Sequence, residues 1–340
     1  GVLGRPVECN ISTQARQNGS TFASAALKLV VEEKCDFVAS GYSGESGPAT
    51  FVKYDVPYLY GEGSAACIDI QTGDPEGWNV YCNNDMAYHN GRWYAERLLG
   101  IIEESGYEFP NHKLAQIGSP WEWDTDVNRA VADVLTEHGW EVVYYENFPL
   151  ETREWESALE KIRALDPAII FTEVWDCHAN ATFRVQFNEN PMPHTLIWRG
   201  QSATMPDYIA MMGEEAEGET MFLCFGLPPG AEDWIERFEN RFGREPGAMA
   251  APNYNQVKIW ANACEKAGTV EDYRAVCEAM GKYRYEDPDT GNIFDFNEER
   301  YNPRNEFRGE AIYQVQNGKI VQLLFGDEWF PGRKLEPQPW

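Results

Sequence analysis

Five times along the chain, a short apolar run ends in a polar or aromatic turn that a helix-like segment follows. The five junctions occupy residues 37–46, 56–64, 114–123, 169–178 and 196–202 (FVASGYSGES, VPYLYGEGS, LAQIGSPWEW, IIFTEVWDCH and LIWRGQS). Buried strands that alternate with amphipathic helices are typical of α/β folds with parallel sheets, and ligands bind beyond the carboxyl ends of such strands. The junctions are therefore the candidate site. They hold Ser, Gly, Glu, Gln and aromatic side chains and no phosphate-binding loop, which favours holding a small molecule over chemistry on it.

The same pattern predicts individual elements. Strands are expected at residues 7–11, 37–40, 58–60, 311–315 and 320–325, and further strands begin near residues 114, 142, 169, 196 and 222. Helices are expected at residues 20–33, from about 88 to 106, and at 231–242, 253–267 and 270–280. The dipeptide Asn317-Gly318 predicts a two-residue hairpin turn between the last two strands.

The length predicts two lobes, because 340 residues exceed the size of a usual single core. The breaker cluster GLPPG at residues 226–230 suits a crossing between lobes. Because a helical block follows it, we expect lobe 1 to comprise residues 1–84 plus 226–305, and lobe 2 residues 85–225 plus 306–340. The crossings between the lobes would form a multi-strand hinge, with the ligand cleft between the two lobes.

Composition excludes several classes of protein. A hydrophobic content of 43% rules out intrinsic disorder, and no apolar stretch approaches the roughly 20 residues that span a bilayer. The chain carries 28 basic and 55 acidic residues, a net charge of −27, which repels nucleic acid and anionic membranes. We therefore expect neither nucleic-acid binding nor membrane insertion, and interpret the acidity as a solvated surface.

Eight cysteines, an even number, are consistent with an oxidising compartment. Local disulfides are expected first for Cys67 with Cys82 and Cys264 with Cys277, and then for Cys9 with Cys35 and Cys177 with Cys224. The alternative is that several are buried thiols that act as small hydrophobic side chains. The sequons at Asn10, Asn18 and Asn180 fit an exported chain. No signal peptide precedes Gly1, so we expect a trimmed chain or a sequence that starts late.

Catalytic and metal motifs are absent from the sequence. The five histidines show no HExxH or i,i+4 pairing, and residues 287–291 (DPDTG) lack the glycine position and the acidic twelfth ligand of a calcium loop. Residues 41–45 (GYSGE) miss the G-x-S-x-G pattern because Glu45 replaces the last glycine. A doubly wound hydrolase that uses Ser43 or Ser46 is kept as an alternative function. We expect no metal and no cofactor.

Aromatic and acidic side chains concentrate at the junctions. Tryptophans at positions 121, 123, 175 and 198 suit a flat ligand or a quaternary ammonium group, although Trp121 and Trp198 are expected to pack in the core or at the interface between the lobes. Six acids could make the site negative, while others on the surface are solvated. These acids are Glu45, Glu62, Asp85, Glu122, Glu173 and Asp176.

Several segments together resemble a known family. GVLGRPVE, FVASGYSGES, VPYLYGEGS, GEEAEGETMF, NYNQVKIWANACEKAG and TGNIFDFNEE are similar, in order and spacing, to segments of type I periplasmic binding proteins. The nearest branch resembles the leucine/isoleucine/valine, amide and urea receptors of ABC importers. In that family GVLGRPVE follows a first strand and helix that this chain lacks, so the resemblance predicts an N-terminally incomplete copy.

The resemblance implies two Rossmann-like lobes that close by hinge bending on a ligand. It implies that residues 42–46 and 61–64 hold a carboxylate through backbone N–H and hydroxyl groups, and that Trp123 and Trp175 cover the ligand. Gln201 replaces a glutamate that pairs with an ammonium group, and Arg199 lies two residues earlier. The predicted ligand-binding residues are Tyr42, Ser43, Glu45, Ser46, Glu62, Ser64, Asp85, Trp123, Trp175, Arg199 and Gln201.

The expected function is that of a periplasmic or cell-surface receptor that passes a small polar organic ligand to a membrane permease. The ligand would be amino-acid-like, an amide or a carboxylate, with an aromatic or quaternary ammonium compound as a further possibility. A sensor or surface assembly protein that has kept this fold without transport is the other alternative.

Overall fold

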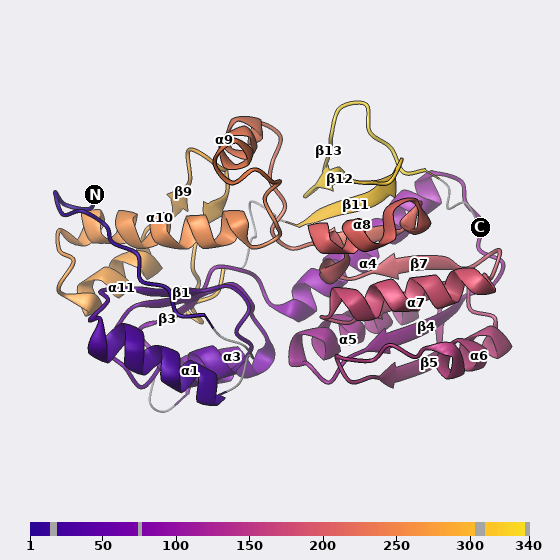
Figure 1. Ribbon diagram of the computed structural model, residues 1–340, viewed down its shortest axis with the longest axis horizontal. Helices are drawn as coiled ribbons and strands as arrows, with labels where there is room; N and C mark the ends of the chain where they lie inside the picture. The colour runs from indigo at the N-terminus through magenta and orange to yellow at the C-terminus, as the bar shows by residue number, and fades with distance from the viewer. Residues whose placement is uncertain (14–18, 74–76, 303–309, 337–340) are drawn as a thin grey trace. The chain divides into compact units, whose positions relative to one another are not determined.

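The computed structural model of the chain describes residues 1–13, 19–73, 77–302 and 310–336 (Figure 1). The chain forms two compact units, and each of them is built from two separate stretches of sequence. The first unit comprises Gly1–Met86 and Gly230–Arg308, and the second comprises Ala87–Pro229 and Gly309–Trp340. Both units alternate strands with helices around parallel strands, which confirms the predicted α/β class.

The first unit is built on a parallel sheet in the order β1-β2-β3. Its strands are β1 (Val38–Ser40), β2 (Tyr58–Tyr60) and β3 (Val80–Cys82), with a small antiparallel pair β9 (Tyr285–Glu286) and β10 (Ile293–Phe294). Its helices are α1 (Gly19–Ala26), the π-helical η1 (Leu27–Glu32), α2 (Ser46–Phe51), α3 (Ala65–Thr72), α9 (Glu232–Phe242), α10 (Ala250–Ala267) and α11 (Tyr273–Lys282).

Side chains alternate across this sheet, so each face has its own core. Tyr58 and Tyr60 of β2 pack with α1 and α2, including Phe22 and Phe51. Leu59, between the two tyrosines, packs instead with residues of α10 and α11. The period-2 alternation of a strand thus binds both helical layers to one sheet.

The second unit contains an eight-stranded sheet in the order β13-β12-β11-β8-β7-β6-β4-β5. Five strands are parallel: β4 (Lys113–Gly118), β5 (Glu141–Asn147), β6 (Ile169–Glu173), β7 (Leu196–Arg199) and β8 (Thr220–Leu223). Three antiparallel strands extend it: β11 (Ala311–Gln316), β12 (Lys319–Phe325) and β13 (Glu328–Trp329).

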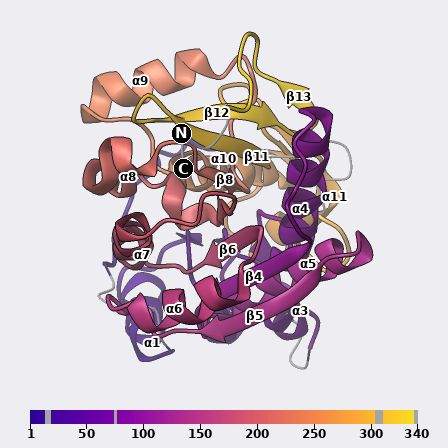
Figure 2. The same cartoon turned by 90° about the vertical axis from the view of Figure 1, so that its right-hand side faces the viewer.

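Helices cover both faces of this sheet. They are α4 (Ala87–Glu104), α5 (Glu122–Glu137), α6 (Glu156–Leu165), α7 (Cys177–Glu189) and α8 (Pro206–Met212), with the 3₁₀ segments η2 (Gln201–Thr204) and η3 (Gly213–Ala216). Figure 2 shows α6, α7 and α8 on one side of the sheet and α4 and α5 on the other. Tyr94 of α4 stacks on Phe222 and meets Trp198, while Ile117, Ile170 and Phe183 pack on the opposite face.

Two sequence predictions of elements are wrong. Residues 7–11 form no strand: Val7 and Ile11 are exposed, and β1 pairs only with β2 among the described residues. An extended segment without a neighbouring strand has no ladder to join. Val80–Cys82, where the sequence pattern predicts no strand, is strand β3 and pairs with β2. No helix within the described ranges is long and apolar enough to cross a membrane.

Candidate functional site

In the first unit, the turns after β1 and β2 lie side by side because the two strands are parallel neighbours. The backbone N–H of Gly61 donates to the carbonyl of Gly41 at 3.1 Å. The Glu62 carboxylate accepts a hydrogen bond of 3.1 Å from the backbone N–H of Gly44. Glu62 is buried, and Gly44 has a φ of +48°, a value that favours glycine. A carboxylate of the protein therefore fixes the turn that the resemblance assigned to a ligand carboxylate.

The remaining predicted residues of this unit differ in exposure. Three of them are buried: Ser43, Ser64 and Asp85. Tyr42 and Ser46 are partly exposed, and Glu45 is exposed. The Ser43 hydroxyl donates to the carbonyl of Gly44 at 3.3 Å, and that of Ser64 to the Cys67 sulfur at 3.3 Å. Asp85 accepts from the backbone N–H of Met86 at 2.7 Å.

Gly47, the second residue of α2, shows why a glycine is needed just after the first turn. A Cβ at this position would lie 2.3 Å from the Tyr58 hydroxyl oxygen and 2.7 Å from the Ser43 Cβ. The glycine thus allows Ser43 to pack directly over β2, whose Tyr58 hydroxyl also bonds to Ser40 at 2.6 Å. The serine position is set by the strand beneath it.

In the second unit, Asp124 joins the turns after β4 and β6. Its Oδ2 accepts from the Ser119 hydroxyl at 2.5 Å and from the backbone N–H of Trp175 at 3.0 Å. Asp124 has no exposed surface and lies in the first turn of α5. The position of Trp175 is therefore held by a charged acceptor from the neighbouring junction.

The tryptophans of these turns divide by exposure. Trp175 is partly exposed, as the proposed role in covering a ligand requires, but Trp123 is only 2% exposed. Trp198 is completely buried, as expected. Trp121, for which a place in the core or at the interface between lobes was expected, is partly exposed, because it precedes the first turn of α5 while Trp123 points into the packed side of that helix.

Glu173, at the end of β6, packs against the turn after β7. A Cβ added to Gly200 would lie 1.2 Å from the Glu173 Oε2. Gln201 follows Gly200 and is buried, and its Oε1 accepts from the thiol of Cys224 at 2.9 Å. The Gln201 side chain is thus bonded to the residue that directly follows β8.

Arg199 belongs to a buried network. Its Nη2 donates to the Glu219 Oε1 at 2.8 Å, and its Nη1 donates to the Thr172 hydroxyl at 2.7 Å. The Tyr208 hydroxyl donates to the other Glu219 oxygen at 2.5 Å, and burial together with the Glu219 charge raises the pKa of Tyr208. Arg199 has no exposed surface, so we assign it the role of holding β6, β7 and the start of β8 together.

The disulfide predictions are wrong. All eight cysteines lie in the described ranges, and all eight are thiols: Cys9, Cys35, Cys67, Cys82, Cys177, Cys224, Cys264 and Cys277. Cys67 and Cys82 pack as small apolar side chains in one core, and Cys264 and Cys277 do so in the other. Burial raises the pKa of Cys67 to about 12, which keeps it a thiol. The buried cysteines therefore serve core packing rather than pairing.

Two further expectations can be compared with the structure. No group of His, Cys, Asp and Glu that could hold a metal ion occurs among the described residues. Asn180, one of the three sequon asparagines, is buried and its amide donates to the Val174 carbonyl and to the Ser202 hydroxyl, both at 2.7 Å. Asn180 therefore ties two junctions together, and the folded chain does not offer it for glycosylation.

Sequence reasoning did not single out Asp124 or Glu219, and it singled out Asn180 only as a sequon. A signal for Asp124 was present, since an acid in the first turn of a helix directly after a junction serine is placed to accept its hydroxyl. Glu219 gave no signal, because its role depends on the pairing of β7 with β8, which brings it beside Arg199.

Two α/β units, each with polar and aromatic side chains at the carboxyl ends of parallel strands, define the class of two-unit α/β binding proteins. Comparisons with known proteins identify the family. The periplasmic binding protein family matches residues 1–318. The chain therefore belongs to the periplasmic binding proteins, a family of binding proteins rather than of enzymes. No curated protein was found to match it in sequence.

Solved structures share the fold. A candidate branched-chain amino acid ABC transporter from Silicibacter pomeroyi is 18% identical with a TM-score of 0.87, covering 100% of this chain and 90% of that one. A leucine binding protein from Thermotoga maritima is 18% identical with a TM-score of 0.79, covering 95% and 88%. An ABC transporter solute binding protein from R. palustris in complex with benzoate is 15% identical with a TM-score of 0.78, covering 98% and 89%.

Proposed function

We propose that this chain is the solute-binding receptor of an ABC importer, acts outside the cytoplasmic membrane, and captures a small polar organic molecule without changing it chemically. Family membership and the similar solute-binding structures support this proposal. The partners would be the small ligand and the membrane permease of the importer. Ligand contacts would come from the strand-end turns of both units.

The observation that carries the choice of ligand is the bond from Gly44 N–H to the Glu62 carboxylate. A ligand carboxylate bound at this turn would lie beside a buried acid of the protein, and like charges at such distances repel strongly. Gln201 offers no charge to an ammonium group either. Among the predicted ligands, we therefore favour a neutral amide or a quaternary ammonium compound over a free amino acid or carboxylate.

The aromatic residues of the turns fit that choice. Trp175 is partly exposed, and its backbone is fixed by Asp124. An indole face can stack on a planar amide or hold a quaternary ammonium group by cation–π attraction, worth about 0.5–2 kcal/mol. Tyr42 and Trp121, which are also partly exposed, extend the aromatic surface available in each unit.

Calorimetry on protein freed of carried-over ligand tests the proposal. The panel pairs each acid with its neutral or cationic counterpart: benzoate with benzamide, leucine with leucinamide, and betaine with choline. For any pair that shows binding, we expect the neutral or cationic member to bind more tightly than the acid. Uniform absence of binding would count against the receptor function, whereas tighter binding of the acids would overturn only the choice of ligand.

Two variants of the turn after β1 and its neighbour test whether the Glu62 charge repels an acidic ligand. Glu62→Gln should improve the affinity for the acid of a pair relative to its neutral counterpart, since it removes the repelling charge. Glu45→Gln changes the same charge on the exposed side of that turn and is the matched control, for which we expect less than a twofold change.

The hydrolase alternative is disfavoured by the family, which is one of binding proteins, and by the lack of a histidine in the unit that holds the candidate serines. All five histidines, His89, His112, His138, His178 and His194, belong to the second unit, whereas Ser43 and Ser46 belong to the first. The hydroxyl of Ser43 donates to a backbone carbonyl, as a structural serine does. The hydrolase predicts a turnover that disappears in Ser43→Ala or Ser46→Ala, while a receptor loses affinity only. A permease gene beside this one would separate transport from a sensor or assembly role.

A further inference from the structure

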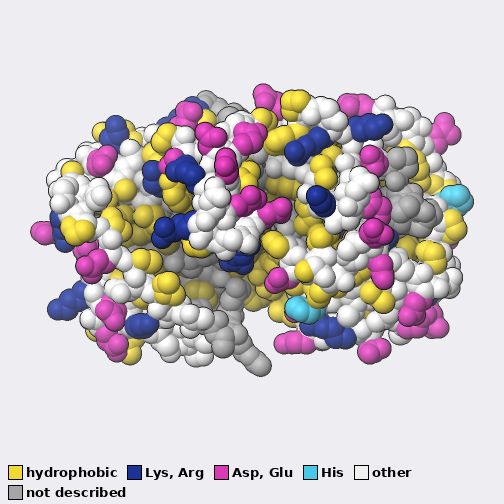
Figure 3. All heavy atoms as spheres, turned by 45° about the horizontal axis from the view of Figure 1, so that its top comes forward, with side chains coloured by type: hydrophobic (Ala, Val, Ile, Leu, Met, Phe, Trp, Pro, Cys, Tyr) yellow, Lys and Arg dark blue, Asp and Glu magenta, His cyan; other side chains and the backbone are white. Residues whose placement is uncertain are grey.

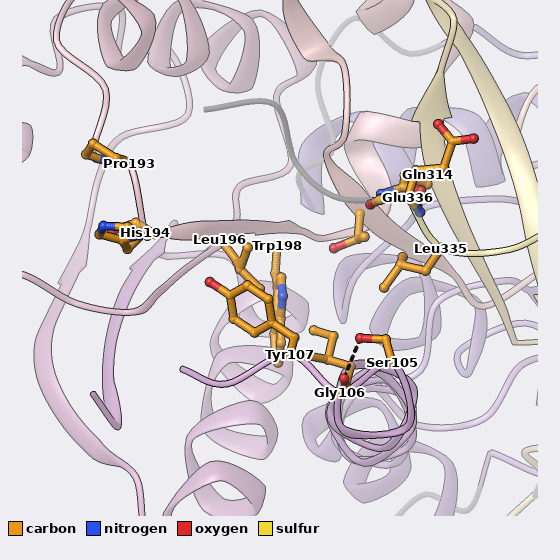
Figure 4. A pocket seen from close by; sticks show the side chains of 13 residues that line it. Ser105, Gly106, Tyr107, Pro193, His194, Leu196, Trp198, Gln314, Leu335 and Glu336 are labelled. Carbon is orange, nitrogen blue, oxygen red and sulfur yellow. Dashed lines mark hydrogen bonds between the residues drawn. The ribbon is translucent and has the colours of Figure 1, made fainter. Parts of the chain in front are cut away.

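A cavity of about 550 Å³ lies in the second unit, at the end of the sheet opposite to the strand-end turns described above. It is formed where β7 and β8 begin, by the segment before β7, the end of α4 and the stretch that follows β13 (Figure 4). Every residue that lines it belongs to the second unit. Its volume is in the range of small-molecule pockets, about 300–1,000 Å³.

The floor of the cavity contains an unused hydrogen-bond donor. Trp198 lines the cavity and has no exposed surface, and its indole Nε1 has no hydrogen-bond partner among the residues that the structure describes. Figure 4 shows the nitrogen on the side of the ring that faces Ser105 and Leu335. Buried N–H groups nearly always find an acceptor in folded proteins, so a donor aimed into a cavity indicates that something else supplies the acceptor.

Three other polar residues of the cavity are already engaged. The Gln314 amide donates to the carbonyls of Gly218 and Glu336 and accepts from the backbone N–H of Glu336. The hydroxyls of Ser105 and Thr195 donate to backbone carbonyls at 2.6 Å each. These groups position the walls. The Trp198 indole and the Thr220 hydroxyl are the buried polar groups of the cavity that make no hydrogen bond within the described residues, so a ligand would meet both.

The walls define the shape and charge of an occupant. Ile102, Leu196, Tyr107 and Leu335 provide apolar and aromatic surface, which suits a flat ring. Glu336, which is exposed and also lines the cavity, disfavours an anion. Nothing in this arrangement uses Tyr42, Trp175 or the other residues of the proposed solute site.

We propose that this cavity is a second binding site, for a neutral, flat molecule of one or two rings that carries a hydrogen-bond acceptor. The acceptor binds the Trp198 indole N–H, and the ring lies against Tyr107, Leu196 and Leu335. The site is separate from the proposed solute site and does not depend on its ligand.

The test uses coumarin, a two-ring molecule with a carbonyl acceptor, and naphthalene, which has a similar shape and no acceptor. Binding is followed by titration of the full chain with ¹⁵N-labelled tryptophan, in which the Trp198 indole signal is assigned by its loss in Trp198→Phe. Coumarin should shift this signal and should bind about three- to tenfold more weakly to Trp198→Phe, the value of one hydrogen bond. Naphthalene should bind both proteins within a factor of two.

Two control variants fix the location. Trp140→Phe makes the same change at a buried tryptophan of the same unit that does not line the cavity, and Trp175→Ala alters the proposed solute site. Both should bind coumarin as the parent does. The proposal is overturned if saturating coumarin leaves the Trp198 signal unmoved, or if either control weakens coumarin as much as Trp198→Phe. It is also overturned if ending the chain at Glu336 moves the Trp198 signal of the ligand-free protein, since the chain itself would then supply the acceptor.

Discussion

Gly200 offers the sharpest test of the packing between two strand-end turns. Its φ of −74° and ψ of −174° are open to any residue, so Gly200→Ala carries no backbone penalty. The added Cβ would, however, lie 1.2 Å from the Glu173 Oε2 and 2.1 Å from its Cδ. Glu173 is 1% exposed and cannot swing into solvent without disturbing its surroundings. The whole effect of the substitution therefore comes from one contact.

The magnitude follows from the cost of overpacking. An inserted carbon in a well-packed interior costs about 1–3 kcal/mol, and a contact this short with a buried carboxylate belongs at the upper end. We expect a loss of about 3 kcal/mol in the free energy of unfolding. A unit of this size loses about 2–4 °C in Tm per kcal/mol, so the transition should fall by roughly 6–12 °C.

The same substitution at Gly100 is the matched control. Gly100 lies inside α4, and a Cβ there would meet no atom within 4 Å. Since Ala is a better helix former than Gly by about 1 kcal/mol, Gly100→Ala should raise Tm slightly. Glu173→Ala combined with Gly200→Ala should cost less than the sum of the single changes, because the clash has been removed.

The measurement is the Tm of four variants, by calorimetry or fluorescence: Gly200→Ala, Gly100→Ala, Glu173→Ala and Glu173→Ala with Gly200→Ala. A Gly200→Ala protein that melts within 2 °C of the parent would refute the reasoning, and so would a cost that is unchanged in the Glu173→Ala background. Opposite signs at positions 200 and 100, with coupling between 173 and 200, would establish that the β6 carboxylate sets the path of the turn before Gln201.

Three other predictions follow from the buried and paired groups. Arg199→Met should cost about 3 kcal/mol in urea unfolding, because the buried Glu219 loses its nearer cation, at 2.8 Å, and keeps Arg184 at 3.6 Å. Arg92→Met, at a surface pair with Glu137, should cost less than about 1 kcal/mol; equal costs would contradict the assigned network. Hydrogen bonds from Tyr254 and Arg237 lower the pKa of Asp289 from 3.8 to about 2. A depressed folded pKa gives stability that is present above pH 4 and lost as pH falls toward 2, so Asp289→Asn should flatten the change of Tm in that window, and an unaltered slope would argue against the pairing. Thiol titration in denaturant without reductant should find eight thiols, and in the native protein the exposed Cys9 should react fastest. A count below eight would support the disulfide prediction instead.

Strands and turns could be predicted from the sequence where the residues within the element determine its structure. The strand at Tyr58–Tyr60 has the predicted bounds, and the hairpin turn is confirmed, with φ of +54° at Asn317 and +69° at Gly318. Residues 7–11 have the composition of a strand but no partner, and Val80–Cys82 forms one because β2 lies beside it. Whether an extended segment pairs depends on residues distant in sequence, which a local pattern cannot reveal.

Polar residues at the strand ends were harder to assign because these positions serve two purposes. Parallel strands leave polar groups at their carboxyl ends that the protein must itself satisfy, and Glu62, Arg199 and Gln201 are all bonded to neighbouring turns or strands. A sequence pattern gives equal weight to such supporting groups and to groups that face a ligand. The difference lies in remaining surface, which Trp175 and Tyr42 keep and Arg199 lacks. Supporting residues should therefore lose stability when replaced and facing residues should lose affinity alone, so that measuring both quantities on the same variants sorts the predicted site into its two parts.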